Sequence, residues 1–171
     1  GLTEMLTLAQ RCSPIELLVL DVDGVLTDGR ISLAGADVEV KDFHVRDGSG
    51  MAVWRNAGKR TAIITGRNSP AVARRAAELR IEFVTQGSAD KATALAAILA
   101  ATGLRPNQAA AVGDDLPDVP VLRAVGLAIA VADACSEARQ LAHYVTQNRG
   151  GHGGVREAIE LIMHCQGIWP K

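Results

Sequence analysis

The feature that most constrains the fold is a regular alternation of short apolar runs with helix-like stretches. The first run covers residues 15–20 and stops at Asp21, as a strand buried on both faces would. Similar runs recur at residues 61–65, 82–85, 109–112, 127–131 and 143–145. Helix-like stretches lie at residues 50–57, 69–80, 90–102, 118–124, 136–142 and 154–166, after a weak one at 4–11. This alternation predicts an α/β fold with a Rossmann-like, doubly wound parallel sheet.

Residues 28–45 depart from the alternation. Two short β-like pieces, residues 30–33 and 38–40, flank a turn-like segment at 34–37, which predicts a β-hairpin inserted after the first strand. A chain of 171 residues is typical of one domain. We therefore expect a single domain over residues 1–171, without a second domain that caps the site.

Composition limits the classes of function. The chain has 18 Lys and Arg against 19 Asp and Glu, and this balance argues against a nucleic-acid-binding module. No apolar stretch approaches the ~20 residues of a membrane span. Cys12, Cys135 and Cys165 form no C-x-x-C pair, which suits a reducing compartment. We expect a cytoplasmic protein with no nucleic-acid or membrane partner.

Polar residues follow three of the predicted strands, at the point where each strand ends. They are Asp21 and Asp23 after the first run, Thr65, Gly66 and Arg67 after the second, and Asp114, Asp115 and Asp118 after the fourth. The carboxyl ends of parallel strands meet at one edge of a sheet, where α/β proteins bind ligands. The sequence thus predicts five carboxylates, a hydroxyl group and a guanidinium group at one edge.

Such crowded carboxylates repel one another unless a cation lies among them. Oxygen ligands without His or Cys favour Mg²⁺, the usual partner of carboxylates and phosphate. Asp21 could serve as a nucleophile in phosphoryl transfer, and Asp23 could protonate the leaving alcohol and then activate water. Thr65 and Lys91 could hold the phosphoryl oxygens.

Each of these signals has a weaker interpretation. A lone D-x-D pair usually lies in a solvated loop, Thr65-Gly66 alone is more often a turn, and Lys91 alone is more often a solvated helix lysine. A calcium loop fails, because it needs an oxygen ligand at Val25 and a glutamate at Ser32. The glycine-rich segment at 150–154 lacks the P-loop pattern. The order and spacing of the motifs favour the catalytic interpretation.

The same residues resemble a known family. The segment DVDGV at residues 21–25, Thr65-Gly66, Lys91 and GDD at 113–115 resemble, in order, the four motifs of the haloacid-dehalogenase-like phosphatases. Further segments are similar to one capless subfamily, the 3-deoxy-D-manno-octulosonate 8-phosphate phosphatases, which act in lipopolysaccharide precursor synthesis. These segments are residues 44–48, 63–67, 86–87, 133–134, 144–146 and 150–157.

The resemblance implies a division of roles. Mg²⁺ would be held by the side chains of Asp21 and Asp114 and by the backbone carbonyl of Asp23. Asp115 would support the water shell of the metal, and Asp118 could belong to its outer shell. Asp21 would be the nucleophile, and Asp23 the acid and base. A pocket for a sugar-acid phosphate would be built from Asp23, His44, Val45, Arg46, Asp47, Gly48, Thr65, Gly66, Arg67, Arg75 and Lys91. A homotetramer would close this pocket with neighbouring subunits.

Three positions depart from the subfamily pattern. His44 stands where asparagine is usual, Ser49 where an aromatic residue is usual, and Ala52 where arginine is usual. Arg46 and Arg67, which related enzymes for nine-carbon acids tend to lack, are both kept. We predict the eight-carbon substrate, 3-deoxy-D-manno-octulosonate 8-phosphate. A nine-carbon sugar-acid phosphate, another small phosphate ester and a non-catalytic binding module remain as alternatives.

Overall fold

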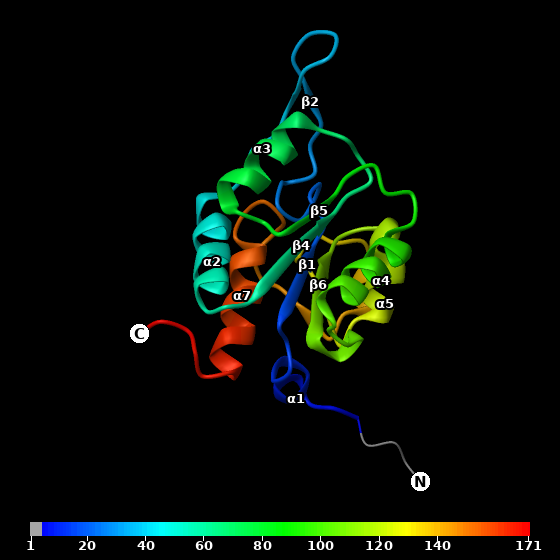
Figure 1. Ribbon diagram of the computed structural model, residues 1–171. Coiled ribbons are helices and arrows are strands. Elements are labelled where there is room, and N and C mark those ends of the chain that lie inside the picture. The colour runs from blue at the N-terminus through cyan, green and yellow to red at the C-terminus, as the bar shows by residue number, and fades with distance from the viewer. Residues whose placement is uncertain (1–4) are drawn as a thin grey trace.

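Six parallel strands form the central sheet in the computed structural model, which describes residues 5–171 (Figure 1). The strand order is β5-β4-β1-β6-β7-β8, with every neighbouring pair parallel. The strands are β1 (Leu17–Leu20), β4 (Arg60–Ile64), β5 (Phe83–Thr85), β6 (Ala109–Gly113), β7 (Leu127–Ala130) and β8 (Tyr144–Val145). All residues of β1, β6 and β7 are buried, which explains their uninterrupted apolar sequences.

Helices cover both faces of the sheet. One group comprises α2 (Val45–Asn56), α3 (Pro70–Leu79) and α7 (Gly154–Cys165), and the other comprises α4 (Lys91–Thr102), α5 (Val119–Ala124) and α6 (Ser136–Leu141). The short α1 (Leu8–Cys12) packs near α7 below the sheet (Figure 1). This three-layer arrangement confirms the predicted doubly wound α/β fold.

Local sequence fixes the start and end of α4, which positions one functional lysine. The Asp90 side chain accepts a hydrogen bond from the Thr93 N–H at 3.0 Å, so Asp90 is the N-cap and Lys91 the first helical residue. Gly103 ends the helix with a φ of 69°. Lys91 is therefore held at a helix end that faces the carboxyl edge of the sheet.

The predicted hairpin is present but short. Strands β2 (Ser32–Leu33) and β3 (Glu39–Val40) pair antiparallel in a separate two-stranded sheet, which projects beyond the carboxyl end of β1 (Figure 1). Within residues 5–171, the connection from β1 to α2 holds this hairpin and no cap domain. None of the described helices is both long and apolar enough to cross a membrane.

Two predicted boundaries were wrong. Helix α2 begins at Val45, before the expected residue 50, because His44 acts as its N-cap and accepts a hydrogen bond from the Arg46 N–H. Gly48 and Gly50 lower the helix propensity of residues 45–50, so the sequence pattern did not predict a helix there. The weak first helix begins at Leu8, where a capping box at Thr7 starts it; residue 4 of that prediction lies outside the described residues.

Candidate active site

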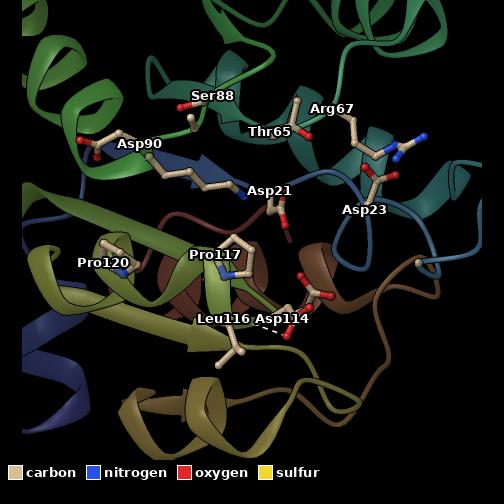
Figure 2. A pocket seen from close by; sticks show the side chains of 15 residues that line it. Asp21, Asp23, Thr65, Arg67, Ser88, Asp90, Asp114, Leu116, Pro117 and Pro120 are labelled. Carbon is tan, nitrogen blue, oxygen red and sulfur yellow. Dashed lines mark hydrogen bonds and ion pairs between the residues drawn. The ribbon is translucent and has the colours of Figure 1, made fainter.

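A cavity of about 590 Å³ opens at the carboxyl ends of β1, β4 and β6 (Figure 2). The predicted residues that line it are Asp21, Asp23, Thr65, Gly66, Arg67, Lys91, Asp114 and Asp115. They come from three strand ends and from the start of α4. The convergence of these segments follows from the parallel sheet, because all the strands point the same way.

The segment after β1 folds into a tight turn that turns two carboxylates toward the cavity. The N–H groups of Val25, Leu26 and Thr27 all donate to the carbonyl of Val22. Val22, Val25 and Leu26 are buried in the core, which anchors the turn. Asp21 and Asp23 alternate with Val22 and therefore line the cavity instead.

Gly24 permits this turn to approach the strand end that carries Asp114. Its φ is +87°, and a Cβ atom there would clash with the carboxylate of Asp114. We expect Gly24→Ala to raise the Mg²⁺ concentration for half-maximal activity by about tenfold or more, because Asp114 must move. Activity measured across a Mg²⁺ titration would test this.

Gly58→Ala is the matched control for Gly24→Ala. Gly58 has a similar φ of +81°, but none of the described residues has an atom within 4 Å of an added Cβ. Both variants should lose about 1–2 kcal/mol of unfolding free energy from backbone strain, so only the clash with Asp114 distinguishes them. An unchanged Mg²⁺ requirement in Gly24→Ala would contradict the expectation.

Lys91 lies between two carboxylates at the base of the cavity. Its Nζ is 3.0 Å from Asp21 Oδ1 and 2.8 Å from Asp118 Oδ1, and the lysine is 6% exposed. Asp118 Oδ2 accepts hydrogen bonds from the N–H groups of Asp114 and Asp115. Asp118 thus positions both Lys91 and the loop after β6.

The carboxylates fit a divalent cation. Oxygens of Asp21, Asp114 and Asp118 lie within 4.8 Å of one another, and Asp114 Oδ1 is buried without a hydrogen-bond partner among residues 5–171. Burial and the neighbouring carboxylates raise the pKa of Asp114 to about 9 and, against the opposing effect of Lys91, that of Asp21 to about 6. A bound cation removes this repulsion, and an all-oxygen donor set suits Mg²⁺.

The free oxygens favour two of these three residues as ligands. Both oxygens of Asp118 already accept hydrogen bonds, whereas Asp114 Oδ1 accepts none from the part of the chain that the structure describes. Asp21 and Asp114, the two side chains that the sequence predicts as metal ligands, are therefore better placed than Asp118 to bind a cation. The metal role of the Asp23 backbone carbonyl stays a prediction. The side chain of Asp23 binds Lys41.

The sequence reasoning missed Lys41 and Glu39, which the hairpin brings into contact with the cavity-lining residues Asp23 and Arg67. Lys41 Nζ donates to Asp23 Oδ1 and, at 2.7 Å, to Glu39 Oε1. Glu39 also accepts from Arg67 Nε and Nη2, each at 3.2 Å. The available signal was the i, i+2 spacing of Glu39 and Lys41, which places both side chains on one face of an extended strand.

Other predicted pocket residues lie apart from this cavity. His44 and Arg46 line a second cavity of about 300 Å³, together with His152 and Arg156 of the α7 region. Val45 is exposed. This separation arises because α2 begins at Val45 and packs along α7, rather than extending to the sheet edge.

Asp47, Gly48 and Arg75 hold helices together within this chain. The buried Asp47 accepts a hydrogen bond from the Arg156 N–H at 2.9 Å. The Arg75 guanidinium lies over the Phe43 ring and against Gly48. A role for these residues, and for His44, Val45 and Arg46, in substrate binding stays a prediction.

Comparisons with known proteins agree with this geometry. A family model for haloacid dehalogenase-like hydrolases matches residues 80–159. The 3-deoxy-D-manno-octulosonate 8-phosphate phosphatase of Yersinia pestis is 45% identical over 157 residues, which cover 92% of this chain and 84% of that protein.

Two solved structures are also similar. A Moraxella catarrhalis protein of the same name, in complex with magnesium, phosphate and KDO, has a TM-score of 0.91 at 42% identity, covering 93% of this chain and 91% of that one. A probable phosphatase of Pseudomonas syringae has a TM-score of 0.91 at 48% identity, covering 93% and 90%. The chain therefore belongs to the 3-deoxy-D-manno-octulosonate 8-phosphate phosphatase family of the haloacid dehalogenase-like hydrolases.

Proposed function

We propose that this protein is a Mg²⁺-dependent phosphatase that hydrolyses 3-deoxy-D-manno-octulosonate 8-phosphate to the free sugar acid and inorganic phosphate. The observation that carries the proposal is the group formed by Asp21, Lys91 and Asp114 at the base of one cavity. It combines a nucleophile, a cation for phosphoryl oxygens and a metal ligand, which are the parts that phosphoryl transfer requires.

The reaction has two steps. A carboxylate oxygen of Asp21 attacks phosphorus, the bond between phosphorus and the sugar oxygen breaks, and Asp23 gives its proton to that oxygen. Water then attacks the aspartyl-phosphate, Asp23 takes a proton from this water, and Asp21 is released as a carboxylate together with phosphate. Lys91 and Thr65 hold the phosphoryl oxygens in both steps. Mg²⁺, when bound by Asp21 and Asp114, supplies positive charge that offsets the charge of the phosphoryl group.

Arg67 is the proposed partner of the substrate carboxylate. Its side chain is 46% exposed at the cavity rim, where Glu39 holds the guanidinium group. A planar guanidinium can bind both oxygens of a carboxylate. Gly66 already lines the cavity. In an assembled enzyme, His44, Val45, Arg46, Asp47, Gly48 and Arg75 would complete the pocket.

A panel of phosphate esters tests the proposed substrate. We expect kcat/KM for 3-deoxy-D-manno-octulosonate 8-phosphate to exceed that for a nine-carbon analogue by about tenfold or more, since one misplaced polar contact costs about 1–3 kcal/mol. Phosphate release with each ester is the measurement. A higher value for the nine-carbon acid would change the substrate, and no release from any ester would favour a binding module.

We infer that the hairpin mediates assembly, and the family resemblance suggests four copies. Ile31, Leu33, Val38 and Val40 are each between 45% and 73% exposed in the single chain. An isolated two-stranded hairpin is marginally stable in water, so its apolar side chains need a cover. A second copy of the same hairpin is a cover of matching shape and polarity.

Leu33→Asp tests this assembly. A buried, unpaired carboxylate at the interface costs several kcal/mol, so we expect the sedimentation coefficient to fall from that of a tetramer to that of a smaller species. Leu6→Asp changes an apolar residue that is 55% exposed but outside the hairpin, and it should leave the assembly unchanged. A fully active wild-type monomer would contradict the inference.

We also propose that the enzyme works in the cytoplasm. Cys12, Cys135 and Cys165 are free thiols in the described part of the chain, which suits a reducing compartment. Fractionation of cells that express the protein, followed by immunodetection, would test this location.

A further inference from the structure

Lys41 has a buried, charged side chain whose partners are Asp23, which lines the main cavity, and Glu39. Its side chain is 1% exposed, and its Nζ donates to Asp23 Oδ1 and Glu39 Oε1. Lys41 directly follows β3, and the hairpin brings its side chain to Asp23, 18 positions earlier in the chain. Burial of an ammonium group is costly unless the group is paired with an opposite charge. One partner of Lys41 is Asp23, the residue that we propose as both acid and base.

The contact with Lys41 involves only one of the two carboxylate oxygens of Asp23. Oδ1 accepts the hydrogen bond from Lys41, whereas no group among residues 5–171 donates one to Oδ2. Asp23 also lines the main cavity, with Arg67 beside it (Figure 2). A carboxylate with one oxygen fixed has one oxygen left for proton transfer, in a set orientation.

A second buried lysine shows what a purely structural role involves. Lys59 has a side chain that is 6% exposed, and its Nζ donates to the backbone carbonyl of Ile15 at 2.6 Å and lies 3.3 Å from Glu16 Oε1. It also lies over the ring of Trp54, a residue of α2. Lys59 thus holds the segment before β1 and lies outside the main cavity lining, whereas Lys41 donates to Asp23, the proposed acid and base, and to no backbone group among residues 5–171.

We infer that Lys41 is a positioning residue for Asp23: it fixes Oδ1 so that Oδ2 points to the substrate oxygen that must be protonated. This inference rests on the proposed phosphatase function. Glu39 also accepts a hydrogen bond from Lys41 and is in turn bound by Arg67. Without Lys41, the carboxylate can turn toward the Arg67 guanidinium, which lies beside it in the main cavity (Figure 2).

The test compares two leaving groups in Lys41→Met. A sugar alkoxide leaves slowly unless it is protonated, whereas 4-nitrophenolate leaves readily without a proton. We expect kcat/KM for the sugar-acid phosphate to fall about 10²-fold, and that for 4-nitrophenyl phosphate to fall less than about tenfold. The ratio of the two values does not depend on the concentration of active sites, so partial unfolding cannot produce the change.

Lys59→Met is the matched control, with the same substitution at another buried lysine. It should lower the thermal unfolding midpoint and leave the ratio of the two kcat/KM values unchanged. If Lys41→Met does not fold, Lys41→Gln removes the charge with a smaller change of shape and should shift the ratio in the same direction.

The outcomes separate the inference from the proposed function. An equal loss for both esters, or no loss for either, in Lys41→Met would overturn the role of Lys41 while the phosphatase stands. A wild-type protein that hydrolyses neither ester would instead overturn the proposed function itself.

Discussion

Asp21→Asn is expected to lower kcat by about 10⁴-fold or more, because the amide cannot attack phosphorus. The fold should survive, since asparagine has nearly the same shape. The metal-free variant should even gain stability at pH 7, because burial and Asp118 raise the pKa of Asp21 to about 6 and the neutral amide avoids the repulsion. Phosphate release and thermal unfolding, measured on the same preparation, test both parts.

Asp90→Asn is the matched control for this variant. Asp90 lines the same cavity, but its side chain caps α4, and asparagine is an equally good N-cap. We expect its kcat to stay within about threefold of wild type. An Asp21→Asn enzyme with more than about 1% of wild-type activity would exclude Asp21 as the nucleophile.

Removing the metal is expected to lower activity nearly as much as Asp21→Asn does. Treatment with EDTA should lower activity about 10³-fold or more, and added Mg²⁺ should restore it, because the phosphoryl charge then faces uncompensated carboxylates. Ca²⁺ serves as a comparison, since it is larger and prefers more ligands at longer distances. Full activity in EDTA would contradict a metal-dependent mechanism.

The metal should also change how stability depends on pH. The folded-state pKa values of Asp21, about 6, and Asp114, about 9, lie above the ordinary value of 3.8, so protonation favours the folded state. The stabilisation is complete below about pH 4 and is lost as pH rises through about 6 and then about 9. The free energy of unfolding of the metal-free protein should therefore fall as the pH rises from about 4 to about 9.

Thermal unfolding midpoints at pH 5, 7 and 9, with EDTA and with Mg²⁺, measure this effect. Mg²⁺ binds the ionised carboxylates, so its stabilising effect should grow with pH. Asp114→Asn removes the group with the larger pKa shift and should flatten the pH dependence of the metal-free protein. Equal midpoints with and without Mg²⁺ at pH 9 would contradict the proposed ligands.

The sequence by itself determined the sheet and the residues at its edge. Apolar runs buried on both faces identify parallel strands, and parallel strands end together, so Asp21, Thr65 and Asp114 had to meet. Helix capping by Asp90 likewise fixed the position of Lys91. These are local signals, which a few neighbouring residues carry.

Only the tertiary structure decided how side chains distant in sequence share their hydrogen bonds. The hairpin brings Lys41 to Asp23, Asp118 uses both of its oxygens on protein donors, and residues 44–48 pack along α7 instead of the main cavity. Each outcome depends on which donor reaches which oxygen once the elements have packed. The periodicity of apolar residues carries no information about that choice, because it records only which face of an element is buried.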